Sequence, residues 1–210
     1  MKSIEKQIAR ELLQINAIKL NPANPFVWAS GWNSPIYCDN RKTLAYPAVR
    51  TAIRDAFCRL VQEKFPDADA IAGVATGAIA HGVLVADALE LPFSYVRSAP
   101  KSHGLTNLIE GEIKHGQKVV VIEDLISTGM SSLAAVDALR NAGCEVLGMM
   151  AIFTYGFPHS VKAFEDAGCK LYTLSNYEAL IPEAIEMNYI ESGSLETLRK
   201  WRNSPETWNK

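Results

Sequence analysis

The stretch "VVVIEDLISTGMSSLAAVDALR", from Val119 to Arg140, decides the fold of this 210-residue chain. Four apolar residues lead to two adjacent acids, and a run of small polar residues then leads into a helical pattern. A buried strand of a parallel sheet passes into a helix in this way, and ligands bind at the edge of the sheet where such turns lie. We therefore predict a strand over residues 118–122, a helix over residues 132–140 and a ligand site between them.

Apolar segments of strand length recur along the chain. The predicted strands cover residues 70–74, 93–96, 118–122, 145–153 and 170–174. Helical patterns separate most of them, and one begins at Pro47, a residue type that suits the first turn of a helix. This alternation predicts an α/β fold with a mainly parallel central sheet flanked by helices.

The first 45 residues do not follow this alternation. Residues 1–16 carry apolar side chains at helical spacing, and the next segment is rich in asparagine, proline and aromatic residues. We predict one structural domain with two parts: a helix and cap over residues 1–45, and an α/β core over residues 46–210. The helical pattern that starts at Ser194 is predicted to lie on the surface.

The composition excludes several classes of protein. With 48% hydrophobic and 21% charged residues the chain can bury a substantial core, and its net charge of -2 provides no basic surface for nucleic acid. No apolar run approaches the roughly 20 residues that span a bilayer, and the N-terminus does not resemble a signal peptide. We expect a cytoplasmic protein that binds neither nucleic acid nor membrane.

The polar run after the acids has the properties of a phosphate site. Backbone N–H groups and the dipole at the start of a helix attract anions. The hydroxyls of Ser127, Thr128, Ser131 and Ser132 add hydrogen-bond donors, and Gly129 allows a close approach of the backbone. A helix cap without a ligand uses the same residue types.

Two carboxylates before a phosphate site require an explanation, because Glu123 and Asp124 would repel a bare triphosphate. Carboxylates accept hydrogen bonds from vicinal hydroxyls, and Mg²⁺ can be held through a sugar and a diphosphate. The stretch therefore suits a ribose 5-phosphate. Gly111 to Gly116 has the glycine spacing of a Walker loop, but Gln117 stands where that loop has its lysine.

These residues also match a known pattern. The segment "VVVIEDLISTGMSS" resembles the signature of type I phosphoribosyltransferases that binds 5-phosphoribosyl 1-pyrophosphate (PRPP). The segments "FVWASGWNSPIYCD" and "YVRSAPKSHGL" resemble the N-terminal hood and the mobile catalytic loop of orotate phosphoribosyltransferases, so the resemblance covers nearly the whole chain. It implies the type I phosphoribosyltransferase fold with a small N-terminal hood.

The resemblance also implies an activity. Members of this family transfer ribose 5-phosphate from PRPP to orotate and form orotidine 5′-monophosphate and pyrophosphate, a step of de novo pyrimidine (UMP) biosynthesis. It further implies Mg²⁺ as cofactor, held mainly through PRPP and not by direct protein ligands, and a homodimer whose active sites are shared across the interface. The alternatives are a purine or xanthine phosphoribosyltransferase and a non-catalytic regulator that senses PRPP.

Individual residues receive roles from the same resemblance. The implied PRPP-binding residues are Ala75, Thr76, Gly77, Arg97, Lys101, His103, Glu123, Asp124, Leu125, Ile126, Ser127, Thr128, Gly129, Met130 and Ser131. The implied catalytic residues among them are Arg97, Lys101, His103 and Asp124, and the implied orotate-binding residues are Ser127, Tyr37 and Tyr155. Glu123 and Asp124 would accept hydrogen bonds from the ribose hydroxyls.

Two further segments bear on this assignment. Residues 73–80, "GVATGAIA", resemble the family's pyrophosphate-binding turn, although tight packing of a strand against a helix explains the same small residues. Residues 98–117 have weak apolar periodicity and are predicted to form a long loop or loose hairpin, a kind of segment that is often functional. Some family members carry basic residues where this chain has Ala29, Ser98 and Tyr155.

Overall fold

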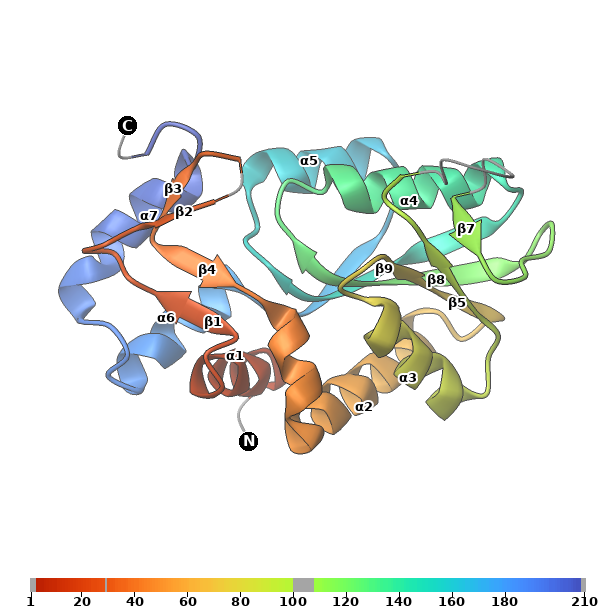
Figure 1. Ribbon diagram of the computed structural model, residues 1–210, viewed down its shortest axis with the longest axis horizontal. Coiled ribbons are helices and arrows are strands. Elements are labelled where there is room, and N and C mark those ends of the chain that lie inside the picture. Colours follow the sequence, from red (N-terminus) through yellow and green to blue (C-terminus); the bar gives the residue numbers. More distant parts are fainter. Residues whose placement is uncertain (1–2, 29, 100–107, 209–210) are drawn as a thin grey trace.

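The computed structural model describes residues 3–28, 30–99 and 108–208. Its centre is a six-stranded sheet in the order β10-β9-β8-β5-β6-β7 (Figure 1). The strands are β5 (Ala70–Val74), β6 (Phe93–Val96), β7 (Ile109–Glu110), β8 (Lys118–Ile126), β9 (Glu145–Thr154) and β10 (Leu171–Asn176). Neighbouring strands are parallel except for β7, which runs antiparallel to β6. The predicted α/β class is confirmed.

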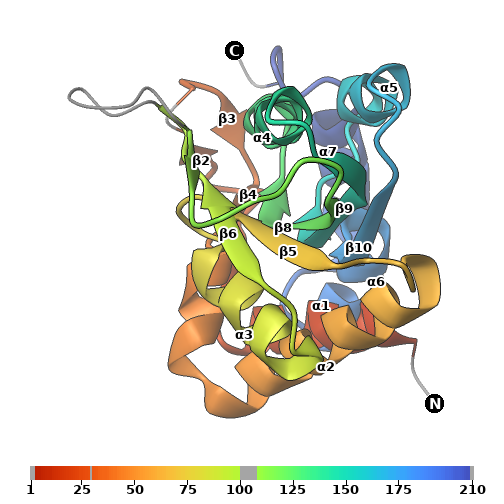
Figure 2. The same cartoon turned by 90° about the vertical axis from the view of Figure 1, so that its right-hand side faces the viewer.

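Helices cover both faces of the sheet. They are α1 (Ile4–Gln14), α2 (Pro47–Lys64), α3 (Ile79–Leu89), α4 (Met130–Asn141), α5 (Pro158–Asp166), α6 (Tyr177–Glu186) and α7 (Leu195–Asn203). Figure 2 shows α4 and α5 on one face and α1, α2, α3 and α6 on the other. None of the helices within the described ranges is both long and apolar enough to cross a membrane.

The alternation of side chains along β8 explains this layering. Val119 and Val121 are buried with α4 and α5, whereas Val120 and Ile122 are buried in the cluster that contains α1, α2 and α3. Successive side chains of a strand point to opposite faces, so a strand that is covered on both faces is a continuous apolar run. The sequence of β8 therefore requires helices on both sides.

The segments before α2 form the hood. It contains β1 (Ile18–Leu20) paired with β4 (Ile36–Cys38), β2 (Phe26–Val27) paired with β3 (Asn33–Ser34), and a 3₁₀ helix, η1 (Asn40–Ala45). Figure 1 shows it beside the end of the sheet toward which β8 points. Ile8 and Leu12 of α1 belong to the same buried cluster as Ile53 and Phe57 of α2, so α1 shares its core with the sheet.

All five predicted strands are present, but one boundary was wrong in a way that concerns the site. The acids Glu123 and Asp124 lie inside β8 and not after it, because β9 continues to pair with β8 as far as Ile126. Residues 98–117 were predicted to form a long loop or a loose hairpin, and within them β7 makes a hairpin with β6.

The last helix was predicted to lie on the surface, and it has exposed residues, but one of its faces is buried. Trp201 of α7 is fully buried, and Leu198, one helical turn earlier, is buried with it. The indole of Trp201 meets Trp28, Tyr155 and Phe157 edge-on, with ring centroids 5.7, 5.6 and 5.3 Å apart. A short 3₁₀ helix, η2 (Ser192–Ser194), precedes α7. Helix α7 is thus a structural element of the core.

Substitution Trp201→Ala should lower the free energy of unfolding by about 3–5 kcal/mol, because it leaves a cavity among aromatic side chains that cannot close it. Urea denaturation measures this change. The control is Lys200→Ala, an exposed residue paired with Glu196 on the same helix, which should stay within about 0.5 kcal/mol of the unchanged protein. A loss at Trp201 as small as that of the control would show that α7 does not stabilise the core.

Candidate active site

Two cavities lie side by side at the carboxyl edge of the sheet, beneath the hood. The first, of about 490 Å³, has walls of Trp28, Trp32, Tyr37 and Tyr155 and is called here the aromatic cavity. The second, of about 430 Å³, is called the acidic cavity, and its charged lining residues are Asp39, Arg41, Glu123 and Asp124. Cys38 and Leu125 line both, so a ligand can extend from one into the other.

Aromatic rings from three parts of the chain shape the aromatic cavity. Trp28 of the hood lies over Tyr155, with ring centroids 5.1 Å apart, and it stacks on Trp32 at 6.4 Å. Tyr155 is only 2% exposed and rests on Trp201. Burial raises the pKa of the Tyr155 hydroxyl well above its usual value, so this ring stays neutral. An aromatic cavity lining of this kind suits a planar ring.

No charged side chain is among the described residues that line the aromatic cavity. Its polar groups come from Ser30, Ser127, Thr128 and the Tyr37 hydroxyl. The predicted orotate-binding residues Ser127, Tyr37 and Tyr155 are therefore brought together here. Thr128 joins them, although the resemblance implied for it a place beside the 5-phosphate.

Glu123 is buried within the site. It is 5% exposed, its Oε1 accepts the Asp124 N–H at 2.9 Å, and its Oε2 accepts the Ser132 hydroxyl at 2.8 Å. Burial, with the nearby charge of Asp124, raises the pKa of Glu123 to about 8. The prediction that Ser132 faces a phosphate was wrong, because its hydroxyl is buried and donates to Glu123.

Asp124 lies against the turn that follows β5. The acidic cavity contains Ala75, Thr76 and Gly77 of this turn together with Asp124. A Cβ atom at Gly77 would overlap the Asp124 carboxylate, so only glycine leaves room for the acid there. The predicted pyrophosphate turn and the predicted ribose-binding acid thus face one cavity.

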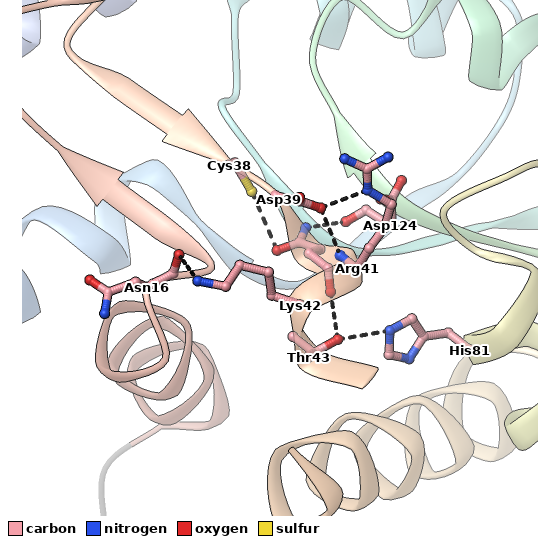
Figure 3. Close-up of polar contacts among 9 residues, drawn as sticks. Asn16, Cys38, Asp39, Arg41, Lys42, Thr43, His81 and Asp124 are labelled. Carbon is pink, nitrogen blue, oxygen red and sulfur yellow. Dashed lines mark hydrogen bonds and ion pairs between the residues drawn. The ribbon is translucent and has the colours of Figure 1, made fainter. Parts of the chain in front are cut away.

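A chain of hydrogen bonds connects Asp124 to the hood and to α3 (Figure 3). Asn40 donates from Nδ2 to the Asp124 carbonyl at 2.6 Å, and the Thr43 hydroxyl donates to the Asn40 carbonyl at 2.5 Å. Thr43 Oγ1 also lies 3.0 Å from His81 Nε2, and because the hydroxyl proton is already donated, the histidine N–H is the donor. Burial lowers the pKa of His81 to about 4, so the ring is neutral.

The turn into α4 lies where the phosphate site was predicted. Gly129 precedes the helix with a φ of +84°, and a Cβ there would come within 2.9 Å of the Phe164 ring. Ser131 lines the acidic cavity, whereas Met130 lines the aromatic one. The Ile126 side chain is fully buried, and its carbonyl accepts the Tyr155 N–H, so only its backbone can take part in binding.

The predicted cations of the loop are placed only in part. Lys101 and His103 lie outside the described residues, as does Ala29. Arg97 lies 3.5 Å from Glu110 across the β6–β7 hairpin and is not among the described residues that line either cavity. Ser98 does line the acidic cavity. Sequence reasoning missed Asn40 and Arg41, which follow an unremarkable polar pattern in the hood.

Comparison with known proteins agrees with this geometry. The model of the phosphoribosyl transferase domain family matches residues 42–184. The chain is 61% identical over 208 residues to an orotate phosphoribosyltransferase of Porphyromonas gingivalis, covering 99% of each chain. The chain belongs to the orotate phosphoribosyltransferase family. The family match includes both acids, the turn after β5 and the start of α4.

Solved structures support the family fold. The chain is similar to the UMP synthase of Leishmania donovani, with a TM-score of 0.78 and 27% identity over 94% of this chain and 42% of that longer one. It is also similar to an orotate phosphoribosyltransferase of Aeropyrum pernix, with a TM-score of 0.75 and 24% identity over 87% of this chain and 99% of that one. The type I phosphoribosyltransferase fold is thereby confirmed for this family member.

Glu123→Gln should change how the stability of this orotate phosphoribosyltransferase family member depends on pH. Between the usual carboxyl range and pH 8, the unfolded chain releases the Glu123 proton and the folded chain keeps it. Stability contributed by this group therefore falls as pH rises. The free energy of unfolding of the unchanged protein should fall, relative to that of Glu123→Gln, by about 1 kcal/mol or more from pH 5 to 8.

Urea denaturation at several pH values measures this difference. Glu165→Gln, at an exposed carboxyl on α5, is the control and should follow the unchanged protein across the range. If the curves of Glu123→Gln and the unchanged protein run parallel, Glu123 is ionised in the folded state.

Proposed function

We propose that this chain transfers ribose 5-phosphate from PRPP to orotate in the presence of Mg²⁺ and forms orotidine 5′-monophosphate and pyrophosphate, in de novo pyrimidine synthesis. The observation that carries the proposal is the pair of adjoining cavities: a flat, aromatic one and an acidic one that share Cys38 and Leu125. The two substrates correspond to these two cavities: orotate is a planar base, and PRPP is a sugar that bears phosphates.

The aromatic cavity provides the place for orotate. The pyrimidine ring packs against the aromatic side chains that line this cavity, and the hydroxyls of Ser127 and Tyr37 donate to its oxygen atoms. Because the described lining is uncharged, the orotate carboxylate is held by neutral donors within it. The aromatic cavity favours a planar anion over an aliphatic one, because a planar ring can stack on its aromatic lining. This stacking also fixes the plane of the ring relative to the acids of β8.

The acidic cavity provides the place for PRPP. Glu123 and Asp124 accept hydrogen bonds from the ribose hydroxyls, while the turn into α4 binds the 5-phosphate with its backbone N–H groups and with Ser131. Carboxylate oxygens are ligands that suit Mg²⁺. Among the described residues there is no cluster of three or more acidic, histidine or cysteine side chains that could hold a metal ion.

The reaction forms a bond from a ring nitrogen to the anomeric carbon and breaks the bond from that carbon to pyrophosphate. Its transition state has oxocarbenium character, so the leaving group gains negative charge and the sugar becomes sensitive to water. Bound Mg²⁺ neutralises part of the pyrophosphate charge. Arg97, Lys101 and His103 are the predicted loop residues that add positive charge and hydrogen bonds and exclude water when the loop closes.

An assay across bases tests the proposal and its alternatives. Protein, PRPP and Mg²⁺ are mixed with orotate, uracil, adenine, guanine or xanthine, and the ultraviolet absorbance of each base is followed. We expect orotate alone to be consumed, with pyrophosphate released. Turnover of a purine without turnover of orotate would assign a purine or xanthine phosphoribosyltransferase, and PRPP binding without any turnover would indicate a regulator.

Lys101→Ala should lower kcat by about a hundredfold or more and change KM for PRPP much less, if the lysine acts mainly as the transition state forms. Steady-state kinetics measure both values. The control is Lys114→Ala, an exposed lysine near the end of the same connection, which should leave kcat unchanged. An unchanged kcat in Lys101→Ala would remove Lys101 from the mechanism.

The same variant tests the proposed homodimer with shared active sites. If Lys101 of one subunit completes the site of the other, a mixture of Lys101→Ala with Asp124→Asn regains some activity, because mixed dimers contain one site with both residues intact. Light scattering gives the mass of the assembly independently. A dimer that regains no activity on mixing would place Lys101 in its own subunit's site.

A further inference from the structure

Arg41 is the one arginine or lysine among the described residues that line the acidic cavity. It comes from η1 of the hood, whereas the acidic residues of the cavity are Asp39, Glu123 and Asp124. The carboxylates of Asp39 and Asp124 make the cavity unfavourable for a phosphate group unless the guanidinium faces it. The position of Arg41 therefore decides whether an anion can enter.

Asp39 holds Arg41 from one side only. The Arg41 Nε donates to Asp39 Oδ1 at 2.7 Å, and Figure 3 shows the two terminal nitrogens pointing away from Asp39. This bond lowers the pKa of Asp39, so the Asp39 carboxylate and the Arg41 guanidinium are both charged. Within the described ranges of the chain no acceptor is bonded to the terminal nitrogens, and 62% of the side chain is exposed. An arginine held in this way presents a planar pair of donors, which matches two phosphate oxygens.

The opposite wall needs such a cation. The turn of Ala75, Thr76 and Gly77 has no charged side chain, and Ser98 occupies the position beyond β6. Arg97 is close to Glu110 on the hairpin. The turn can offer backbone N–H groups and a hydroxyl to a pyrophosphate, but it leaves the negative charge of that group uncompensated.

We propose that Arg41 of the hood binds the pyrophosphate group of PRPP, with Asp39 as the positioning residue that aims its guanidinium across the cavity at the turn after β5. This inference rests on the proposed function, since it names a further binding residue for the same substrate. It assigns to the hood two tasks: its aromatic residues contact the base, and its arginine contacts the leaving group.

Three variants test Arg41. Arg41→Ala removes the cation, Arg41→Lys keeps the charge without the planar fork, and Lys42→Ala is the matched control. Lys42 carries the same charge one residue away, donates to the Asn16 carbonyl at 3.0 Å and does not line the cavity. Thermal melting shows that each variant is folded. If Arg41→Ala does not fold, Arg41→Gln takes its place.

The first measurement needs no turnover. Calorimetric titration with pyrophosphate and Mg²⁺ should give binding that is weaker by roughly ten- to a hundredfold in Arg41→Ala, intermediate in Arg41→Lys and unchanged in Lys42→Ala. Equal binding by Arg41→Ala and the unchanged protein would overturn the proposal. An equal loss of binding in Lys42→Ala would also overturn it, because the effect would then come from net charge alone. The absence of pyrophosphate binding by the unchanged protein would overturn it as well.

The second measurement uses the reaction. Arg41→Ala should raise KM for PRPP, and KM for pyrophosphate in the reverse direction, by a similar factor, while KM for orotate stays within about twofold. A rise in KM for orotate alone would place Arg41 at the base and overturn the proposal. If the unchanged protein binds pyrophosphate but does not consume orotate, the proposed function fails, and the titration still decides the role of Arg41.

Discussion

The structure depends on one constraint: a central, largely buried strand, β8, carries two adjacent carboxyl groups. Strand β8 has neighbours on both edges and helices on both faces, and pairing with β9 continues past Glu123 and Asp124. A buried carboxylate is costly unless it is hydrogen-bonded or protonated. Ser132 and the Asp124 N–H satisfy Glu123, and Asn40 and Gly77 surround Asp124. The hood, the turn after β5 and helix α4 therefore all contact the same two acids.

The hood is joined to the core by polar contacts as well as by packing. Asn40 and Thr43 connect the Asp124 backbone to His81, and the histidine lies on the helix that starts just after the turn at Gly77. The neutral state of His81 follows from its burial, so this connection does not change with charge near neutral pH. A shift of the hood would disturb the acids and the turn together, since they share this chain of hydrogen bonds.

The sequence was sufficient to predict those elements whose pattern lies within a few consecutive residues. The apolar runs of β5 and β8 and the small polar turn before α4 are each contained in a few consecutive residues, and a strand, a turn or a helix start can be recognised from them. The family resemblance added the prediction of the hood and the place of Tyr37 beside Ser127 and Tyr155, which line one cavity. The end of β8 was missed because it is set by pairing with β9, whose residues lie 28 positions later in the chain, as in the pair of Ile126 and Thr154.

Contacts between distant segments could not be predicted. Asn40 and Arg41 occupy a short polar stretch with no periodicity, and only the fold brings them to Asp124 and the turn after β5. The burial of Trp201 was missed for a related reason. A helix with many charged residues resembles a solvent-exposed one, and Leu198 and Trp201 can be assigned to the core only from the fold, which packs Trp201 against Trp28 and Tyr155.

The position of Trp201 has a consequence for the order in which this protein matures during translation. The rings that line the aromatic cavity come from the hood and from Tyr155, directly after β9, and Tyr155 rests on Trp201 of α7. On the ribosome, Trp28 emerges long before the helix that supports its partner Tyr155, so the hood must wait with an exposed indole until the C-terminal helix arrives. The aromatic cavity can therefore be complete only after the chain has been synthesised and released as far as α7.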